Sequence, residues 1–178
     1  MKKLGKIILL LIGIFVVLGI FHKPMLKQVY KLEYRDIIDK NAKKYNVDKY
    51  LMYALIKKES RYDPLAVSKK GAIGLTQIMP ETGKYIAELL EDKDFKANDL
   101  YDAEVSIEYG TFYLSKLKKD FNGNLESMLA AYNGGEGNVR KWLGDESHLN
   151  ENEIPFKQTK NYVKSIKRDC EIYKYLYD

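Results

Sequence analysis

Apolar side chains recur every three or four positions along most of the chain after Pro24, which is the spacing of one face of an α-helix. Two clear stripes consist of Leu32, Ile37, Ile38 and Tyr45 near the start of this region, and of Tyr162, Ile166, Ile172 and Leu176 at its end. No alternating apolar and polar segment of useful length appears, so the pattern predicts no β-strand. We therefore expect a mainly α-helical body.

Residues typical of helix ends delimit several of these predicted helices. Asp48 is a typical N-cap for a helix that ends at about Glu59. Pro80 suits the first turn of the next helix. Asn124 is a typical N-cap of a later helix, which Gly134 ends as a C-terminal glycine. The connections between these helices are therefore expected to be short loops.

The N-terminal segment has a different pattern. Fifteen consecutive residues, Ile7 to Phe21, carry no charge and follow a lysine-rich start. As a helix, this run covers about 22 Å of a hydrocarbon core about 30 Å thick. A span that begins at Leu4, with the Lys6 side chain reaching toward the surface, gains about 5 Å. The run ends in "GIFHKP", which lacks a small-residue cleavage site, so an uncleaved signal anchor is favoured over a cleaved signal.

The chain thus divides into three predicted parts. Residues 1–22 are expected to form a membrane-anchor helix, residues 23–30 a linker, and residues 31–178 one globular domain. Lysines flank both sides of the apolar run, so charge alone leaves the orientation of the anchor open.

Composition narrows the classes of function. The 178 residues include a single cysteine, Cys170, so no intramolecular disulfide is possible. The two histidines, His22 and His148, lie far apart in sequence, and no paired Cys/His spacing typical of zinc sites occurs. No phosphate-binding P-loop motif occurs either, so we expect neither a metal nor a cofactor. The net charge of +5 comes from scattered lysines, which is typical of a solvated surface and not of a nucleic-acid-binding protein.

Glu59 interrupts an apolar helical face. It follows Leu51 and Leu55 at intervals of four, so the three side chains share one face, whereas Lys57 and Lys58 point elsewhere. A carboxyl group in that position is partly desolvated, which raises its pKa and keeps it protonated nearer to neutral pH. Such a group has the property that a general acid needs.

Three motifs carry a resemblance to a known family. "ESRYDPLAVSKKGAIGLTQIMPETG", "AYNGG" and "PFKQTKNYVKSI" occur in this order between about Asp48 and Ile166. Together they resemble the soluble lytic transglycosylases of glycoside hydrolase family 23, whose fold is similar to goose-type lysozyme. The resemblance implies an all-α, lysozyme-like catalytic domain over residues 31–178 with a glycan cleft. It also implies cleavage of the β-1,4 bond between N-acetylmuramic acid and N-acetylglucosamine in peptidoglycan, with a 1,6-anhydromuramic end as product.

The resemblance also implies roles for individual residues. Glu59 corresponds to the catalytic acid/base of the family. The substrate-binding positions are Ser60, Ser68, Gln77, Met79, Tyr132, Asn133 and Tyr162. Their chemistry agrees with sugar binding, which uses amide and hydroxyl groups together with apolar or aromatic faces. The expected partner is a peptidoglycan glycan strand, and the sequence identifies no protein partner.

Two positions depart from the pattern of the family. Thr76 stands where the family usually has methionine, which puts the shape of a sugar subsite in doubt. Gln158 stands where the family usually has glutamate, so it cannot serve as a second catalytic acid. Asp63 precedes Pro64 and is typical of a turn.

Two alternative functions stay open at this point. A muramidase that uses water, like goose-type lysozyme, needs a second acid, for which Asp63 and Glu81 are the candidates. A membrane-tethered glycan-binding protein without activity is the other alternative, and an intact Glu59 argues against it. Because peptidoglycan lies outside the membrane, either enzyme requires the domain on the extracytoplasmic side, with the lysines at positions 2, 3 and 6 inside.

Overall fold

The computed structural model describes residues 2–178, so the first residue of the predicted anchor lies outside the described part of the chain. The described residues form helices joined by loops, with two isolated β-bridges before α4 and no strand. The elements are α1 (Lys2–Val29), α2 (Arg35–Tyr45), α3 (Lys49–Glu59), α4 (Pro80–Leu90), η1 (Ala97–Tyr101), α5 (Ala103–Asp120), α6 (Leu125–Gly134), α7 (Glu136–Leu143), η2 (Glu151–Glu153) and α8 (Lys157–Tyr177). The prediction of a mainly helical body is confirmed.

The predicted helix ends agree with the structure where capping residues mark them. The Asp48 carboxylate accepts a hydrogen bond from the Tyr50 backbone N–H at 2.8 Å at the start of α3. The Asn124 side chain accepts one from the Ser127 N–H at 2.8 Å at the start of α6. Pro80 is the first residue of α4.

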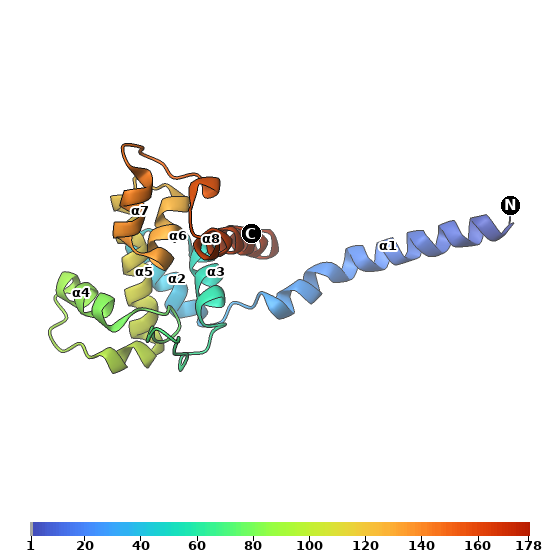
Figure 1. Ribbon diagram of the computed structural model, residues 1–178. Coiled ribbons are helices and arrows are strands. Elements are labelled where there is room, and N and C mark those ends of the chain that lie inside the picture. The colour runs from blue at the N-terminus through green and yellow to red at the C-terminus, as the bar shows by residue number, and fades with distance from the viewer. Residues whose placement is uncertain (1) are drawn as a thin grey trace.

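Helix α3 lies at the centre of the body. Seven consecutive residues, from Tyr50 to Ile56, are buried on all sides of this helix. It packs against α8 and α2, while α6 packs against α7 and α8, and α2 against α5. Figure 1 shows these helices gathered into one body, with α4 at its edge. Both ends of this buried helix reach the surface, with Lys49 exposed at its start and Lys58 exposed next to Glu59 at its end.

Helix α1 extends away from this body (Figure 1). It continues through Val29, so residues 23–29, which we expected to form a linker, are helical instead. The next residue, Tyr30, is only 7% exposed and belongs to the hydrophobic core. The junction is therefore part of the fold. Among the described residues, no helix meets the length and apolarity that a membrane crossing requires.

Candidate active site

Glu59 is the last residue of α3 and lies at the point where this central helix reaches the surface. Its carboxyl group is half-buried, and the Tyr162 hydroxyl of α8 donates a hydrogen bond of 2.5 Å to Oε1. Tyr162 itself is only 4% exposed, so this hydrogen bond forms at the edge of the core. The structure thus brings together two predicted site residues that are 103 positions apart in the chain.

Burial raises the pKa of Glu59 from its ordinary value of 4.5 to about 7. The hydrogen bond from Tyr162 and the positive charge of Lys58 act in the opposite direction, because both favour the ionised carboxylate. Since burial prevails, a substantial fraction of Glu59 is protonated at neutral pH. The predicted desolvation of this carboxyl group is confirmed.

Tyr132, at the end of α6, is the second aromatic residue beside Glu59. Its hydroxyl donates to the Thr76 carbonyl oxygen at 2.9 Å, and its ring lies 5.5 Å from the ring of Tyr113. Burial and then the nearby charge of Glu59 raise the pKa of the Tyr132 phenol well above its ordinary value of 10.0. The same two causes raise the pKa of Tyr162. Both phenols are therefore neutral at physiological pH and act as hydrogen-bond donors.

Ser60 connects the end of α3 to the following loop. Its hydroxyl lies 2.9 Å from the Leu75 carbonyl oxygen and 3.2 Å from that of Ile56, and it accepts the Tyr62 N–H at 3.1 Å. The residue is 8% exposed. These contacts describe a structural role next to Glu59, and the predicted contact of Ser60 with substrate stays a prediction.

Gln77 and Ser68 shape the loop between α3 and α4. The side-chain amide of Gln77 donates to the carbonyl oxygens of Ala66 at 3.0 Å and Gly74 at 2.9 Å. The Ser68 hydroxyl accepts the Ala72 N–H at 3.0 Å, which closes a turn. These bonds do not use the side-chain carbonyl oxygen of Gln77 or the hydroxyl proton of Ser68. Gln77 can therefore still accept a hydrogen bond, and Ser68 can still donate one.

Gly74 allows this loop to pass directly over η1. Its φ is +75°, and a Cβ atom built at this position would lie 1.9 Å from the carbonyl oxygen of Leu100. Because that oxygen belongs to the backbone, any side chain here would displace the loop. The sequence favours glycine at 71 and 74 because the backbone can turn tightly there and approach a ligand; at Gly74 the close neighbour is the protein backbone, and approach to a ligand stays a prediction.

Thr76 lies in the interior and does not line a pocket with its side chain. It is fully buried, and its hydroxyl donates to the Ser106 carbonyl oxygen at 2.7 Å, with the Ser106 hydroxyl 3.1 Å away. Gly110 of α5 makes room for it, because a Cβ there would lie 2.5 Å from the Thr76 methyl group. The departure from the family's methionine therefore concerns packing between the loop and α5.

A pocket of about 460 Å³ lies beside Tyr162. Its lining consists of Lys58, Asn133, Lys157, Gln158, Asn161 and Tyr162. Asn133 is exposed there, and its side-chain oxygen accepts the Thr159 hydroxyl at 3.1 Å. Two of the predicted residues thus share one pocket. Lys58, Lys157 and Asn161 were not predicted as site residues, although the spacing of 157, 158 and 161 places these three side chains near one another on one helix.

The remaining candidates lie apart from this pocket. Met79 is 39% exposed at the N-cap of α4. Asp63 is exposed and accepts the Leu65 N–H at 2.9 Å, as expected of a turn residue. Glu81 is exposed in the first turn of α4. Burial, the Tyr162 hydroxyl and the Lys58 charge account for the shifted pKa of Glu59. Among the described residues, no carboxylate contributes to that shift.

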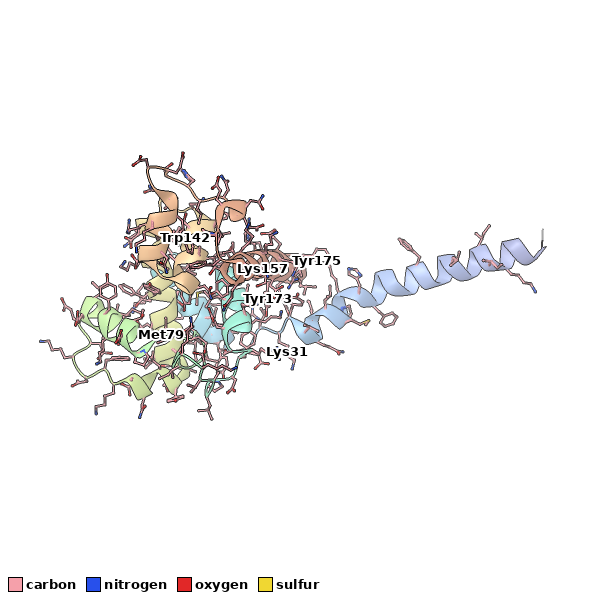
Figure 2. All side chains as sticks on the ribbon, in the orientation of Figure 1. Lys31, Met79, Trp142, Lys157, Tyr173 and Tyr175 are labelled. Atoms are coloured by element: carbon pink, nitrogen blue, oxygen red, sulfur yellow. The ribbon has the colours of Figure 1, made fainter. Side chains whose placement is uncertain are left out.

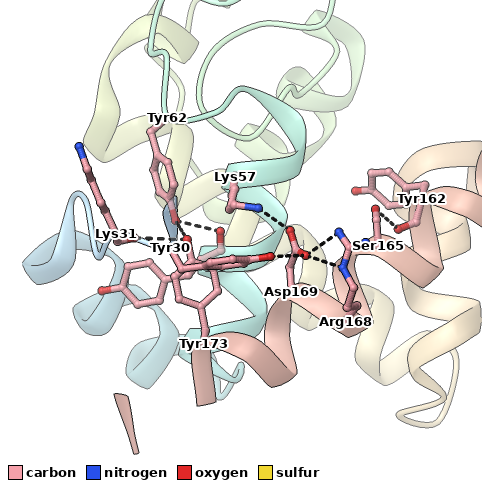
Figure 3. Close-up of polar contacts among 10 residues, drawn as sticks. Tyr30, Lys31, Lys57, Tyr62, Tyr162, Ser165, Arg168, Asp169 and Tyr173 are labelled. Atoms are coloured by element: carbon pink, nitrogen blue, oxygen red, sulfur yellow. Dashed lines mark hydrogen bonds and ion pairs between the residues drawn. The ribbon is translucent and has the colours of Figure 1, made fainter. Parts of the chain in front are cut away.

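Lys57 differs from the sequence prediction, which placed it on a charged face. Its ammonium group binds Oδ2 of Asp169 at 2.7 Å and lies 4.2 Å from the centre of the Tyr30 ring. The Lys57 side chain is 21% exposed, and that of Asp169 is 6% exposed. Figure 3 shows this ion pair together with Arg168, which donates to Oδ1 of Asp169. The Asp169 carboxylate of α8 neutralises the Lys57 ammonium group, which allows this lysine to be largely buried.

Comparison with known proteins agrees with the geometry. The model of the family described as "Transglycosylase SLT domain" matches residues 36–155. The soluble lytic murein transglycosylase of Salmonella typhimurium is 31% identical over 147 residues, which is 79% of this chain and 23% of that protein. Membrane-bound lytic murein transglycosylase C of Yersinia pestis is 31% identical over 134 residues, which is 70% of this chain and 37% of that protein.

A solved structure supports the same assignment of fold. An inactive glutamate-to-glutamine mutant of lytic transglycosylase Slt from Pseudomonas aeruginosa superimposes with a TM-score of 0.78 at 32% sequence identity. The alignment covers 84% of this chain and 25% of that chain. The chain therefore spans well under half of the relatives that it matches. With a family match over most of its length and this shared helical fold, the chain belongs to the Transglycosylase SLT domain family.

Proposed function

We propose that this protein is a membrane-anchored lytic transglycosylase of peptidoglycan, with Glu59 as its single catalytic acid and base. The observation that carries the proposal is the half-buried Glu59 carboxyl group, with a pKa of about 7 and a hydrogen bond from Tyr162. A general acid works best when its pKa is close to the working pH. The names of the relatives, which are lytic murein transglycosylases, give the same substrate class.

The proposed reaction uses one carboxyl group twice. Protonated Glu59 donates its proton to the glycosidic oxygen between N-acetylmuramic acid and N-acetylglucosamine as the C1–O bond breaks. The 2-acetamido carbonyl oxygen of the muramic residue stabilises the cationic C1. The Glu59 carboxylate then takes the proton from the C6 hydroxyl, whose oxygen attacks C1 and closes the 1,6-anhydro ring. Glu59 ends in its starting state, and no water is consumed.

The pocket next to Tyr162 supports a sugar ligand. Asn133, Gln158 and Asn161 offer amide donors and acceptors in this pocket. Tyr162 lines it and binds Glu59, and Tyr132 lies close enough to Glu59 to be affected by its charge. Glycan recognition needs such amide groups and an aromatic or apolar surface. We propose Asn133, Tyr132 and Tyr162, together with Gln77, Ser68 and Met79 on the adjoining loop, as the residues that bind the glycan strand.

The choice between this reaction and a muramidase depends on a second carboxylate. Ordinary glycosidases use two acids, and water needs a placed base. Asp63 and Glu81 are exposed, and Asp63 is engaged in its own turn, so neither supports that alternative. A tethered hydroxyl can reach an effective concentration of about 10⁵ M or more, far above that of water. The C6 hydroxyl is therefore the nucleophile that we propose.

We further propose that residues 1–22 form an uncleaved anchor and that the globular domain lies on the extracytoplasmic side of the cell membrane. The support is the uncharged run from Ile7 to Phe21 and the exposure of its described apolar side chains, such as Phe15 at 80%. Protease added to wall-stripped cells is expected to digest the body. A mature chain that begins after Phe21 and is free in the medium would contradict the anchor.

Product analysis tests the reaction. Purified sacculi digested with the protein in ¹⁸O-labelled water are analysed by liquid chromatography and mass spectrometry. We expect anhydromuropeptides, which are one water lighter than the products of a hydrolase and carry no ¹⁸O. Reducing muramic ends with ¹⁸O would identify a muramidase, and intact sacculi in the presence of folded protein would identify a protein that only binds glycan.

A further inference from the structure

The C-terminal part of α1 contacts the last turns of α8 through polar and aromatic side chains. The imidazole Nε2 of His22 lies 2.5 Å from the Tyr175 hydroxyl, and the Lys23 ammonium group donates to the Tyr175 carbonyl oxygen at 3.2 Å. The Lys23 ammonium group also lies 4.3 Å from the centre of the Tyr175 ring. One turn further along α1, Lys27 lies 4.8 Å from the centre of the Tyr177 ring. The two helices therefore form a collar, defined here as His22, Lys23, Lys27, Tyr175 and Tyr177.

The collar is continued into the core by the residues that follow α1. The Tyr177 hydroxyl donates to the Tyr30 carbonyl oxygen at 2.7 Å. The Tyr30 ring contacts Tyr173 edge to face at 5.3 Å, and its hydroxyl donates to Asp169 at 3.2 Å. Because Tyr30 and Tyr173 are buried, α1 leaves the body in a direction that packing determines. Figure 3 shows how Tyr30 and Tyr173 lie against Asp169 and Lys57.

The position of the collar along the chain matches the edge of a bilayer. The uncharged run ends at Phe21, and His22 and Lys23 follow it directly. Tyr175 contacts these two residues, so it lies at the same level as the end of the apolar run although it comes from the other end of the sequence. Figure 2 shows Tyr175 on the side of the body from which α1 extends, whereas Met79 and Trp142 lie toward the opposite side. Tyrosine and lysine are the residues that favour this interfacial level.

The charge of the collar matches an anionic surface. Lys23 and Lys27 contact aromatic rings and a carbonyl oxygen, and among the described residues neither forms an ion pair with a carboxylate. Their positive charge is thus available to lipid headgroups. Apolar side chains on the same segment are also exposed, namely Phe21 at 54% and Met25 at 63%. Basic groups directly next to an apolar helix attract anionic lipids, and this attraction fades within a Debye length of the surface.

We infer that the collar is a binding surface for an anionic lipid bilayer, which seats the globular domain against the headgroups in one orientation. The inference rests on the proposed membrane anchor, since the collar meets lipid only if α1 enters the bilayer. It adds that the C-terminal end of α8 also contacts the membrane. The consequence is that the Glu59 site is held at a fixed height and direction above the membrane, instead of moving on a loose tether.

The test uses the full chain in vesicles with brominated lipid, which quenches nearby tryptophan. The native tryptophan is first removed by Trp142→Phe. Three variants of that protein then each carry one tryptophan: Phe15→Trp in the anchor, Tyr175→Trp in the collar or Tyr85→Trp on α4. Tyr85 is a matched control because it is an exposed tyrosine, like Tyr175. In vesicles of phosphatidylglycerol and phosphatidylcholine, we expect quenching at 175 to exceed quenching at 85 by at least about two-fold, because the interfacial level holds aromatic rings.

The charge component is tested in the same vesicles. Lys23→Gln with Lys27→Gln should remove about half of the quenching at 175, because each lysine near the surface contributes to attraction by anionic lipid. The exposed loop lysines Lys69 and Lys93, changed to glutamine, serve as the control and should leave it unchanged. Pure phosphatidylcholine vesicles should reproduce the loss. Equal quenching at 175 in both kinds of vesicle would overturn the anionic component of the inference.

The reporter in the anchor separates the two proposals. Strong quenching at 15 with quenching at 175 no greater than at 85 would overturn the collar and leave the anchor intact. Absence of quenching at 15 would overturn the anchor itself and the collar with it. If Tyr175→Trp does not fold, Glu171→Trp replaces it, because Glu171 is an exposed residue of α8 one turn before Tyr175, and its quenching should likewise exceed that at 85.

Discussion

Two carboxyl groups lie near the end of α3 and have opposite properties. Glu59 is half-buried with a phenol as its hydrogen-bond partner, and burial raises its pKa to about 7. For Asp169, burial also acts to raise the pKa, but hydrogen bonds from Lys57 and Arg168 outweigh it and lower the pKa below its ordinary value. The comparison teaches that the partner, and not the depth alone, decides whether a buried acid is a proton donor or a fixed anion.

The largest expected effect concerns the proton of Glu59. Glu59→Gln keeps the size of the side chain but has no proton to deliver, so turnover of sacculi should fall by between about 100-fold and 10⁴-fold. The measurement is the release of soluble fragments, with circular dichroism to show that the variant is folded. Asp63→Asn is the matched control and should keep normal turnover, because Asp63 serves only its own turn. Near-normal turnover of a folded Glu59→Gln protein would remove Glu59 from the mechanism.

Replacement of Asp169 should lower stability and not turnover. Asp169→Asn removes the negative charge that pairs with Lys57, and this should lower the free energy of unfolding by about 3 kcal/mol, the lower end of the range for buried pairs, because Lys57 is partly exposed. Urea denaturation at pH 7 measures this loss. The unfolded chain takes up the Asp169 proton near the ordinary pKa of 3.8, whereas the folded protein does so only at its lowered pKa, so the difference between the two proteins should shrink as the pH falls below about 3.8 toward that lowered pKa. A difference that persists unchanged in strong acid would mean that charge is not its cause.

The two carboxyl groups also differ in what the sequence could predict. The helical pattern and the Asp48 cap predicted α3 with its observed ends, and the spacing of Leu51, Leu55 and Glu59 predicted a desolvated carboxyl group. These are local properties, and the motif of the family added Tyr162. Asp169 could not be identified, because its partner Lys57 is 112 positions away and periodicity assigned that lysine to the charged face.

The loop before α4 shows the same limit. A glycine at position 74 permits a tight turn and a close approach of the backbone, but only the structure shows that the neighbour is the Leu100 carbonyl oxygen. Ser60 carries a hydroxyl that a motif assigns to the site, yet it is buried and hydrogen-bonded to the Leu75 carbonyl oxygen. Thr76, which departs from the pattern of the family, is likewise buried and hydrogen-bonded to the Ser106 carbonyl oxygen. Such contacts depend on tertiary packing, which no local pattern encodes.

A smaller expected effect is that Glu59→Gln makes the folded protein more stable than wild type at alkaline pH. The folded protein binds the Glu59 proton more tightly than the unfolded chain does, so this group favours folding below about pH 4.5 and loses that contribution as the pH rises to about 7. Glu59→Gln has no such loss and should be more stable than wild type at pH 8 by about 1–2 kcal/mol, after allowance for partial exposure of the carboxyl group. Thermal denaturation at pH 5 and pH 8 measures the gain. Equal pH dependence in the two proteins would contradict the raised pKa.

The smallest expected effect is the change in turnover and in its pH dependence when the Tyr162 hydroxyl is removed. The Tyr162 hydroxyl favours the ionised form of Glu59, so Tyr162→Phe should raise the pKa of Glu59 further and move the alkaline limit of activity upward. Turnover at pH 6 should fall by about 10-fold, as expected when one hydrogen bond to a charged group is lost. Tyr109→Phe, which removes a hydroxyl bound to Asp92, is the control and should leave the pH profile unchanged. A downward shift of the limit would reverse the role given to Tyr162.

The most direct measurement is the titration of Glu59 itself. Protein labelled with ¹³C at glutamate carboxyl carbons is followed by NMR from pH 4 to pH 9, and the resonance absent from Glu59→Gln identifies the residue. We expect a midpoint near pH 7 for the Glu59 resonance. A midpoint at or below 4.5 would show a fixed anion like Asp169 and would contradict the proposal that this carboxyl group donates the proton.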